Sequence, residues 1–281
     1  FSRPANKAII TELVEKDELV LYNSRLELVL QVVSVSSPVL SFLVLQFASL
    51  RITLVLDALS FFLAFGLVAL LPKKEEKTLG EKKLTFKVIC ADIKEGVHYI
   101  VKQREIFFLL VMASSVNFFF AAFNYLLPFS NQLYGVQGAY ATILTMGAIG
   151  SIVGALLASK IKASMEMLLF LLALTGLGVM IMGFTLPSYL AFSGNFICEL
   201  FMTMFNIHFF TQVQTKVEGE YLGRVLSSIY TLAILFMPIA TGLMTWLPSV
   251  HLYSFLIIGL GVVALSFLAL GYVRTHFEKE T

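Results

Sequence analysis

The chain has 281 residues, of which 58% are hydrophobic and 14% are charged. A soluble domain has about a quarter of its residues charged, so this composition excludes an ordinary soluble protein and indicates one that lies mostly in a membrane. The formal net charge of +2 says little about partners, because the charges are sorted by loop. Cys90 and Cys198 fall in a predicted cytoplasmic helix and a predicted membrane span, so no disulfide framework is expected.

Eight long apolar stretches run along the chain, and each is close to the ~20 residues that a helix needs to cross a bilayer. They cover residues 26–50, 52–71, 106–129, 137–159, 164–185, 188–213, 225–246 and 250–273. We therefore predict eight transmembrane helices and an all-α multi-pass membrane protein. Trp246 and Tyr253 flank the last predicted extracellular turn, where interfacial aromatic residues are typical.

The basic residues give an independent test of this topology. If each apolar stretch crosses the membrane once, successive loops lie on alternating sides. Nineteen of the twenty Lys and Arg residues then fall on one side, and only Arg51 falls on the other. A wrong number of stretches would scramble this partition. Because Lys and Arg favour cytoplasmic loops, the basic side, which includes the C-terminus, is predicted to be cytoplasmic.

The polar segments divide the chain into four predicted parts. They are residues 1–71 with the end of one helix and two spans, residues 72–104 as a cytoplasmic linker, residues 105–273 as a unit of six spans, and residues 274–281 as a cytoplasmic tail. Within the linker, apolar residues from Phe86 to Val101 recur at helical spacing, which predicts an amphipathic helix. This helix either lies on the inner leaflet or packs beneath the spans.

Paired asparagines indicate an inverted repeat. Asn117 and Asn124 in the third stretch are seven residues apart, and Asn195 and Asn206 in the sixth are eleven apart. These spacings are about two and three helical turns, so each pair lies on one face. Since the two stretches run in opposite directions, the last six spans form an inverted pair of three-helix units, which is typical of transporters. Chance similarity between phenylalanine-rich helices is the alternative.

Polar residues inside the spans are the main candidates for a site, because a central charge costs roughly 2.5–3.5 kcal/mol on insertion scales. Glu199 lies about 16 Å into the sixth stretch at ~1.5 Å per residue, as a candidate proton acceptor or cation contact. Two polar stripes either line a substrate cavity between the third and sixth stretches or only hold helices together by hydrogen bonds. They are Ser114, Asn117 and Asn124, and Asn195, Thr203 and Asn206.

Three further ionisable residues have plainer alternatives. Asp57 in the second stretch is a second candidate for proton coupling, or it pairs with Arg51. Glu27 is expected to form an interfacial pair with Arg25. His208 is expected to be a packed histidine rather than a proton relay.

Small residues recur at i, i+3 and i+7 in two stretches, a spacing that lets helix backbones approach closely. These stripes are Ser34, Ser37 and Ser41 in the first stretch and Gly147, Gly150 and Gly154 in the fourth. We interpret both as helix-contact faces. Aromatic side chains near the polar stripes, such as Phe123 and Phe205, suit an adaptable apolar pocket, or they face lipid.

No set of residues favours an enzyme, and no catalytic residue is proposed. The four histidines are scattered without the spacing of metal ligands, so no metal and no other cofactor is expected. There is no phosphate-binding Gly-Lys-Ser/Thr loop, so we do not expect ATP to drive this chain directly. The basic residues are spread over short loops, which does not favour nucleic-acid binding.

Four segments carry a resemblance to a known family. They are Phe1 to Ser24, including Phe1-Ser-Arg-Pro4 and Asp17-Glu18-Leu19; Asp57-Ala-Leu-Ser-Phe61; Asp92-Ile-Lys-Glu95-Gly96-Val-His-Tyr99; and Glu220-Tyr-Leu-Gly223-Arg224-Val225. The chain resembles the drug-exporter branch of the major facilitator superfamily over nearly its whole length. The segments are most similar to the macrolide-efflux-like and enterobactin-exporter-like group.

The resemblance implies that the eight stretches are the family's fifth to twelfth helices. Residues 1–71 would then be the remnant of an N-terminally truncated first lobe, and the first three helices and most of the fourth would precede Phe1. The family has two six-helix lobes that rock. Its seventh and tenth helices, here the third and sixth stretches, line the cavity. Its fifth and eighth helices, here the first and fourth stretches, meet across the lobe interface.

Two departures from the family pattern limit what the resemblance implies. Ser37-Pro38 stands where antiporters of this kind often carry Gly-Pro. Related exporters tend to have a small residue near the position of Glu199, so its role is not carried over from them.

We therefore expect a secondary active transporter that exports lipophilic, drug-like or macrolide-like molecules from a bacterial cell by proton antiport and alternating access. This would be a multidrug-resistance efflux protein of the plasma membrane. Its expected partners are the lipid bilayer, a small-molecule substrate, protons and the missing N-terminal helices of the same protein, and nucleic acid is not among them. The alternatives are a siderophore or metabolite exporter, or a non-transporting remnant or assembly partner.

Overall fold

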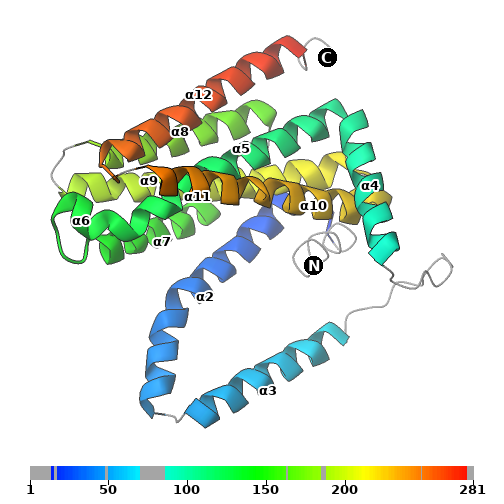
Figure 1. Ribbon diagram of the computed structural model, residues 1–281. Helices are drawn as coiled ribbons and strands as arrows, with labels where there is room; N and C mark the ends of the chain where they lie inside the picture. The colour runs from blue at the N-terminus through cyan, green and yellow to red at the C-terminus, as the bar shows by residue number, and fades with distance from the viewer. Residues whose placement is uncertain are drawn as a thin grey trace. The chain divides into compact units, whose positions relative to one another are not determined.

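The computed structural model describes residues 14–15, 18–47, 50–69, 86–162, 164–184, 188–247 and 249–276. All regular structure among these residues is helical (Figure 1). Two compact units divide the chain: a larger one of residues 1–31 and 90–281, and a smaller one of residues 32–89. The boundaries predicted from the sequence at residues 71, 104 and 273 stay predictions, and each unit is described by itself.

The larger unit is built from long apolar helices. They are α5 (Arg104–Leu126), α7 (Ala139–Ala158), α8 (Met165–Met182), α9 (Ser188–Lys216), α10 (Gly219–Ile234), α11 (Phe236–Trp246) and α12 (Tyr253–His276), with the short η1 (Leu127–Phe129) and α6 (Ser130–Tyr134) after α5. Among the described residues, six segments are long and apolar enough to cross a bilayer: Arg104–Tyr134, Ala139–Ala158, Met165–Met182, Ser188–Lys216, Tyr221–Trp246 and Tyr253–His276. They coincide with the third to eighth apolar stretches, which confirms an all-α multi-pass fold.

Helix α9 has a central place among these spans. It packs against α7 on one side and α8 on another, while α8 also packs against α12 (Figure 1). Helix α5 packs mainly on α10, α11 and α12. The polar stripe of α9 therefore lies inside the helix bundle rather than at its margin.

The seventh predicted span corresponds to the segment Tyr221–Trp246, whose helical hydrogen bonding is interrupted at one residue, Leu235, shortly before a proline. A single helix was expected over residues 225–246, whereas α10 ends at Ile234 and α11 begins at Phe236. Pro238 has no N–H to donate to the Ile234 carbonyl oxygen, and its ring clashes with that carbonyl group. The break at Leu235 follows from this missing hydrogen bond.

Helices α2 (Leu19–Phe47) and α3 (Leu50–Ala69) correspond to the first two apolar stretches. Helix α2 begins in the larger unit and enters the smaller unit after Gln31. In α3, Asp57 is exposed. The side chain of Arg51, its suggested partner, lies outside the described residues, so neither role considered for Asp57 is tested.

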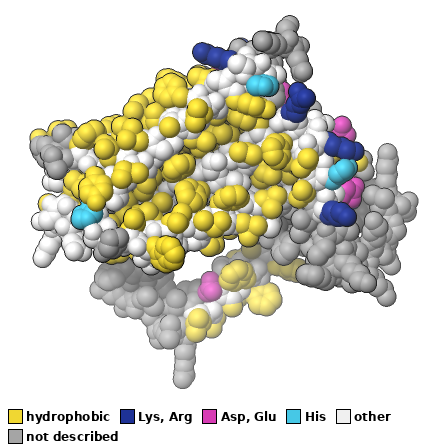
Figure 2. All heavy atoms as spheres, turned by 45° about the horizontal axis from the view of Figure 1, so that its top comes forward, with side chains coloured by type: hydrophobic (Ala, Val, Ile, Leu, Met, Phe, Trp, Pro, Cys, Tyr) yellow, Lys and Arg dark blue, Asp and Glu magenta, His cyan; other side chains and the backbone are white. Residues whose placement is uncertain are grey.

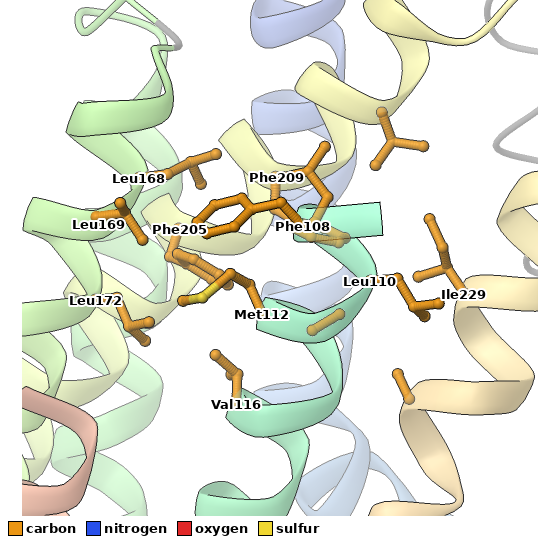
Figure 3. Close-up of a cluster of buried hydrophobic side chains, with 14 of the residues drawn as sticks. Phe108, Leu110, Met112, Val116, Leu168, Leu169, Leu172, Phe205, Phe209 and Ile229 are labelled. Atoms are coloured by element: carbon orange, nitrogen blue, oxygen red, sulfur yellow. The ribbon is translucent and has the colours of Figure 1, made fainter. Parts of the chain in front are cut away.

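Buried apolar side chains form two clusters in the larger unit. In the first, Met112 of α5 lies between Leu172 of α8 and Phe205 of α9 (Figure 3). Phe205 is 3% exposed, and Phe123 in the second cluster is 1% exposed. These two phenylalanines are therefore part of a packed core rather than of the lipid-facing surface.

Charged side chains gather at one end of the larger unit. Three ion pairs lie there: Glu105 with Lys216, Glu95 with Arg224 (2.9 Å), and Glu166 with Arg274 (2.8 Å). Figure 2 shows Lys and Arg at this end of the visible face and apolar side chains over much of the rest. Exposed pairs of this kind contribute about 0–1 kcal/mol each. They therefore identify the polar end of the bundle but add little to its stability.

Helix α4 (Phe86–Lys102) is the predicted amphipathic helix. The ring of Tyr99 stacks on that of Tyr221 at the start of α10, with centroids 4.6 Å apart. Gly96 permits this close approach, because a Cβ at that position would lie 2.6 Å from the Ser228 hydroxyl oxygen. The second half of α4 therefore packs against the spans, which is one of the two placements left open by the sequence.

Labelling of engineered cysteines tests the sidedness of the bundle. Ser249 and Lys162 lie in loops at opposite ends of the larger unit. In a protein without Cys90 and Cys198, we expect Ser249→Cys to react with a membrane-impermeant maleimide in intact cells. We expect Lys162→Cys to react only after permeabilisation, because the basic end is predicted to be cytoplasmic. Reaction of Lys162→Cys in sealed cells would reverse the orientation.

Candidate functional site

Helix α9 carries a stripe of polar side chains through the middle of its span. Asn195, Glu199 and Thr203 recur every four residues, so they lie on one face of the helix. Asn195 and Thr203 are buried and Glu199 is partly buried. Asn206, three residues further on, is also partly buried. The environment of this stripe depends on how closely α7 approaches it.

Glycines in α7 bring its backbone into contact with the backbone of α9. A Cβ at Gly150 would lie 2.3 Å from the Phe196 carbonyl oxygen, and a Cβ at Gly154 would lie 2.3 Å from the Leu200 carbonyl oxygen. A Cβ cannot come this close to an oxygen, so any other residue would force the two helices apart. Small residues at an interface allow this kind of close approach between membrane helices.

The third glycine of the stripe makes room for side chains. A Cβ at Gly147 would lie 2.4 Å from Asn195 Nδ2 and 3.0 Å from Glu199 Cγ. Both side chains therefore occupy the space that a larger residue at position 147 would fill. The glycine stripe and the polar stripe form a single interface between α7 and α9.

This contact corrects the partner expected for the glycine stripe. The family resemblance implied that the face of Gly147, Gly150 and Gly154 meets the first span, whereas the face packs on α9. The spacing of small residues shows that a backbone can approach, but it does not show which helix does so. The side chains of Ser34, Ser37 and Ser41 lie outside the described residues, so the contact predicted for the serine stripe stays a prediction.

Few polar groups of the described residues surround the Glu199 carboxylate. The hydroxyl group of Ser151, on α7, donates a hydrogen bond of 3.4 Å to Glu199 Oε2. This distance is longer than the ordinary 2.5–3.0 Å range for an O–H···O bond. Glu27 of α2 lies within electrostatic reach of Glu199. Glu27 also accepts a hydrogen bond from Gln31, an arrangement not expected from the interfacial pairing with Arg25.

Asn195 links α9 to the backbone of α7. Its Nδ2 donates to the Ile143 carbonyl oxygen at 2.7 Å. The side chain is 2% exposed, and its Oδ1 has no hydrogen-bond partner. Asn195 was predicted to line a substrate cavity, and the structure also gives it this structural bond between helices.

The predicted polar residues of α5 do not join the α9 stripe. Ser114 donates to the Leu110 carbonyl oxygen and Asn117 donates to the Ala113 carbonyl oxygen, both within their own helix. Asn124 is exposed. A cavity between α5 and α9 therefore stays a prediction, and these hydrogen bonds favour the structural alternative for Ser114 and Asn117.

One buried polar contact was not predicted from the sequence. Asn23 of α2 is 2% exposed, and its Nδ2 donates to Gln214 Oε1 at 2.7 Å and to Thr211 Oγ1 at 3.3 Å. The first apolar stretch was predicted to begin at residue 26, whereas α2 already begins at Leu19. The recurrence of Asn23, Glu27 and Gln31 every four residues was the available sequence signal.

His208 is fully buried in α9. Neither of its ring nitrogens has a hydrogen-bond partner. This burial agrees with a packed histidine, and no described contact links the ring to Glu199.

A comparison of the sequence with models of known protein families finds a match: the model for the Major Facilitator Superfamily matches residues 1–233 of this chain. This match covers more than half of the chain. The chain belongs to the Major Facilitator Superfamily. A search of curated proteins and a search of solved structures found no match.

Membership of this superfamily makes the chain a membrane transporter. It also confirms the prediction that the chain is not an enzyme, because the superfamily is one of transporters. The apolar helices of the larger unit agree with a protein that is embedded in a membrane. In such a protein, a carboxylate deep in a span is a candidate site for proton or substrate binding.

The α7–α9 contact predicts an unusual response to a single methyl group. Gly150→Ala should destabilise this transporter by about 1–3 kcal/mol, as overpacking does, because the added Cβ would lie 2.3 Å from the Phe196 carbonyl oxygen. Thermal unfolding of the purified protein measures this change.

Gly242→Ala is the matched control for this substitution. Gly242 lies in α11 with nothing within 4 Å of an added Cβ. Alanine at this position should stabilise the protein by about 0.4–1 kcal/mol, because it reduces the conformational freedom of the unfolded chain. Equal melting temperatures for the two variants would mean that α7 and α9 do not touch at Gly150.

Proposed function

We propose that this transporter exports lipophilic small molecules from a bacterial cell, by proton antiport and alternating access. Glu199 is the proposed site of proton exchange. The observation that carries the proposal is the position of its carboxyl group, between the backbones of α7 and α9 and with one long hydrogen bond from Ser151. The proposal places the protein in the plasma membrane with the basic end in the cytoplasm.

The cost of a carboxylate inside a span supports a functional role. Such a charge costs roughly 2.5–3.5 kcal/mol near the centre of a helix. A neutral side chain could fill the space beside Gly147 and bond to Ser151 equally well. Uptake of a proton removes the charge, and release of the proton restores it, so Glu199 can alternate between two states of the transport cycle.

The resemblance to macrolide-efflux-like exporters supports a lipophilic substrate. The described spans add few charges that could bind a strongly polar molecule: between Ala139 and Ala158 and between Tyr253 and Tyr272 there is no Asp, Glu, Lys or Arg. A siderophore or another polar metabolite would need more charged or hydrogen-bonding groups than these spans offer.

Export of a fluorescent lipophilic cation tests this proposal. In cells that express the full-length protein, Glu199→Gln should reduce ethidium efflux to the level of cells without the transporter, because the amide keeps the shape of Glu199 but cannot exchange a proton. Glu199→Asp should retain part of the activity. Expression and membrane insertion of each variant are measured in parallel.

The comparison with Asp57→Asn identifies the coupling residue. If Glu199→Gln exports at the wild-type rate from mildly acidic to mildly alkaline pH while Asp57→Asn does not, coupling lies at Asp57. A wild-type protein that exports no ethidium but exports a siderophore would support the alternative substrate class. A chain that is inserted in the membrane and moves neither would support a non-transporting role.

A further inference from the structure

The side chains around Glu199 leave one hydrogen-bond acceptor without a donor. The bond from Asn195 Nδ2 to the Ile143 carbonyl oxygen fixes the orientation of the amide, because a carbonyl oxygen requires a donor opposite it. Asn195 Oδ1 therefore faces away from this bond and is buried without a partner. A buried acceptor in this situation is costly, so its missing donor needs an explanation.

Glu199 is the neighbour that can supply this donor. It follows Asn195 by one helical turn, and atoms of both side chains lie within 3.3 Å of the place where a Gly147 Cβ would be. An ionised carboxylate only accepts hydrogen bonds, so it cannot satisfy Asn195 Oδ1. A protonated carboxyl group has an O–H and can donate to it.

We propose that Asn195 is a positioning residue for the proton on Glu199, with its Oδ1 accepting the acid O–H while its Nδ2 holds the Ile143 carbonyl oxygen. This inference rests on the proposed proton exchange at Glu199. The proton adds to a carboxylate oxygen of Glu199 to give the neutral acid, and it leaves from the same oxygen to water. No other bond is made or broken.

The arrangement connects the proton to the backbone of α7. The carboxyl group of Glu199 accepts a hydrogen bond from Ser151, one turn after Gly147 in α7. When it is protonated, it also donates to Asn195, which is bonded to Ile143, one turn before Gly147. Protonation thus adds a second link between Glu199 and α7, through Asn195. Helix α7 is thereby held differently in the two protonation states.

Few other charged or titratable groups face this site. Glu27 approaches Glu199 from α2, with Arg25 two residues earlier. Helix α7 has no Asp, Glu, Lys, Arg or His between Ala139 and Ala158. Cys198 and His208 share α9 with Glu199, and the described charges of α5, α8 and α10 are near the basic end: Arg104, Glu105, Glu166 and Arg224. Among the described residues, Glu27 is therefore the nearby carboxylate whose signal the experiment must distinguish from that of Glu199.

Infrared spectroscopy of the full-length protein in lipid vesicles tests this role directly. The difference between spectra at acidic and alkaline pH contains the carbonyl bands of protonated carboxyl groups. The Glu199 band is the one that is lost in Glu199→Gln and kept in Glu27→Gln. We expect this band at the position of a hydrogen-bonded acid in the wild type and at a higher wavenumber in Asn195→Leu.

Ser193→Ala is the matched control. Ser193 lies on another face of α9, where its hydroxyl group donates to the Leu190 carbonyl oxygen. Removal of this hydroxyl group should leave the Glu199 band in place. A band that moves equally in Ser193→Ala and Asn195→Leu would report a general disturbance of α9 and would overturn the inference.

The outcomes separate this inference from the proposed function. If no pH-dependent band is lost in Glu199→Gln, then Glu199 does not exchange a proton and both proposals fail. If the Glu199 band is present but does not move in Asn195→Leu, the role of Asn195 alone fails. If Asn195→Leu does not fold, the wavenumber of the Glu199 band in the wild-type protein is the test. A wavenumber typical of a carboxyl group without a hydrogen bond would overturn the inference.

Discussion

Backbone contact between α7 and α9 is the constraint on which the rest of the site depends. Gly150 and Gly154 place the two helices so close that a single methyl group would collide with a carbonyl oxygen. Hydrophobic burial does not drive the association of helices in lipid, so close packing and hydrogen bonds between helices have to hold the bundle together. The glycines supply the packing here, and the Asn195 bond to Ile143 supplies a hydrogen bond.

The same contact determines what surrounds Glu199. The space beside Gly147 is filled by Asn195 and Glu199, and the next turn of α7 presents Ser151. The rest of the nearby core is apolar, as the cluster around Met112 and Phe205 shows. The carboxyl group is thus held by a few polar groups in an apolar bundle, and a change in its charge therefore has a large effect on its neighbours.

The sequence predicted most of the fold because a bilayer leaves few choices. Backbone N–H and C=O groups in lipid must form their hydrogen bonds within helices, and Lys and Arg gather in the loops on one side of the membrane. Hydropathy and the positions of the basic residues were therefore enough to locate the spans of the larger unit. The same reasoning located α4 by its periodicity, and Tyr99 then showed which surface it covers. Glu199 was found because a carboxylate is conspicuous in an apolar stretch.

Features that depend on contacts between helices were not predictable in this way. The glycine spacing indicated a close approach but not that α9 is the partner of Gly150. The early start of α2, with Asn23 bonded to Gln214, was missed because polar residues before the apolar stretch resemble a loop. The sequence alone did not show whether the helix continues without interruption through Pro238, because this depends on the packing around the proline.

The central claim is that Glu199 takes up a proton inside the bundle. Reaction with dicyclohexylcarbodiimide tests it most directly, because this apolar reagent modifies protonated carboxyl groups in apolar surroundings, and mass spectrometry locates the adduct. We predict an adduct at Glu199 that decreases as the pH is raised, while the exposed carboxyl groups of Glu105 and Glu166 stay unmodified. Absence of an adduct at Glu199 at every pH, or an adduct that does not change with pH, would contradict the claim.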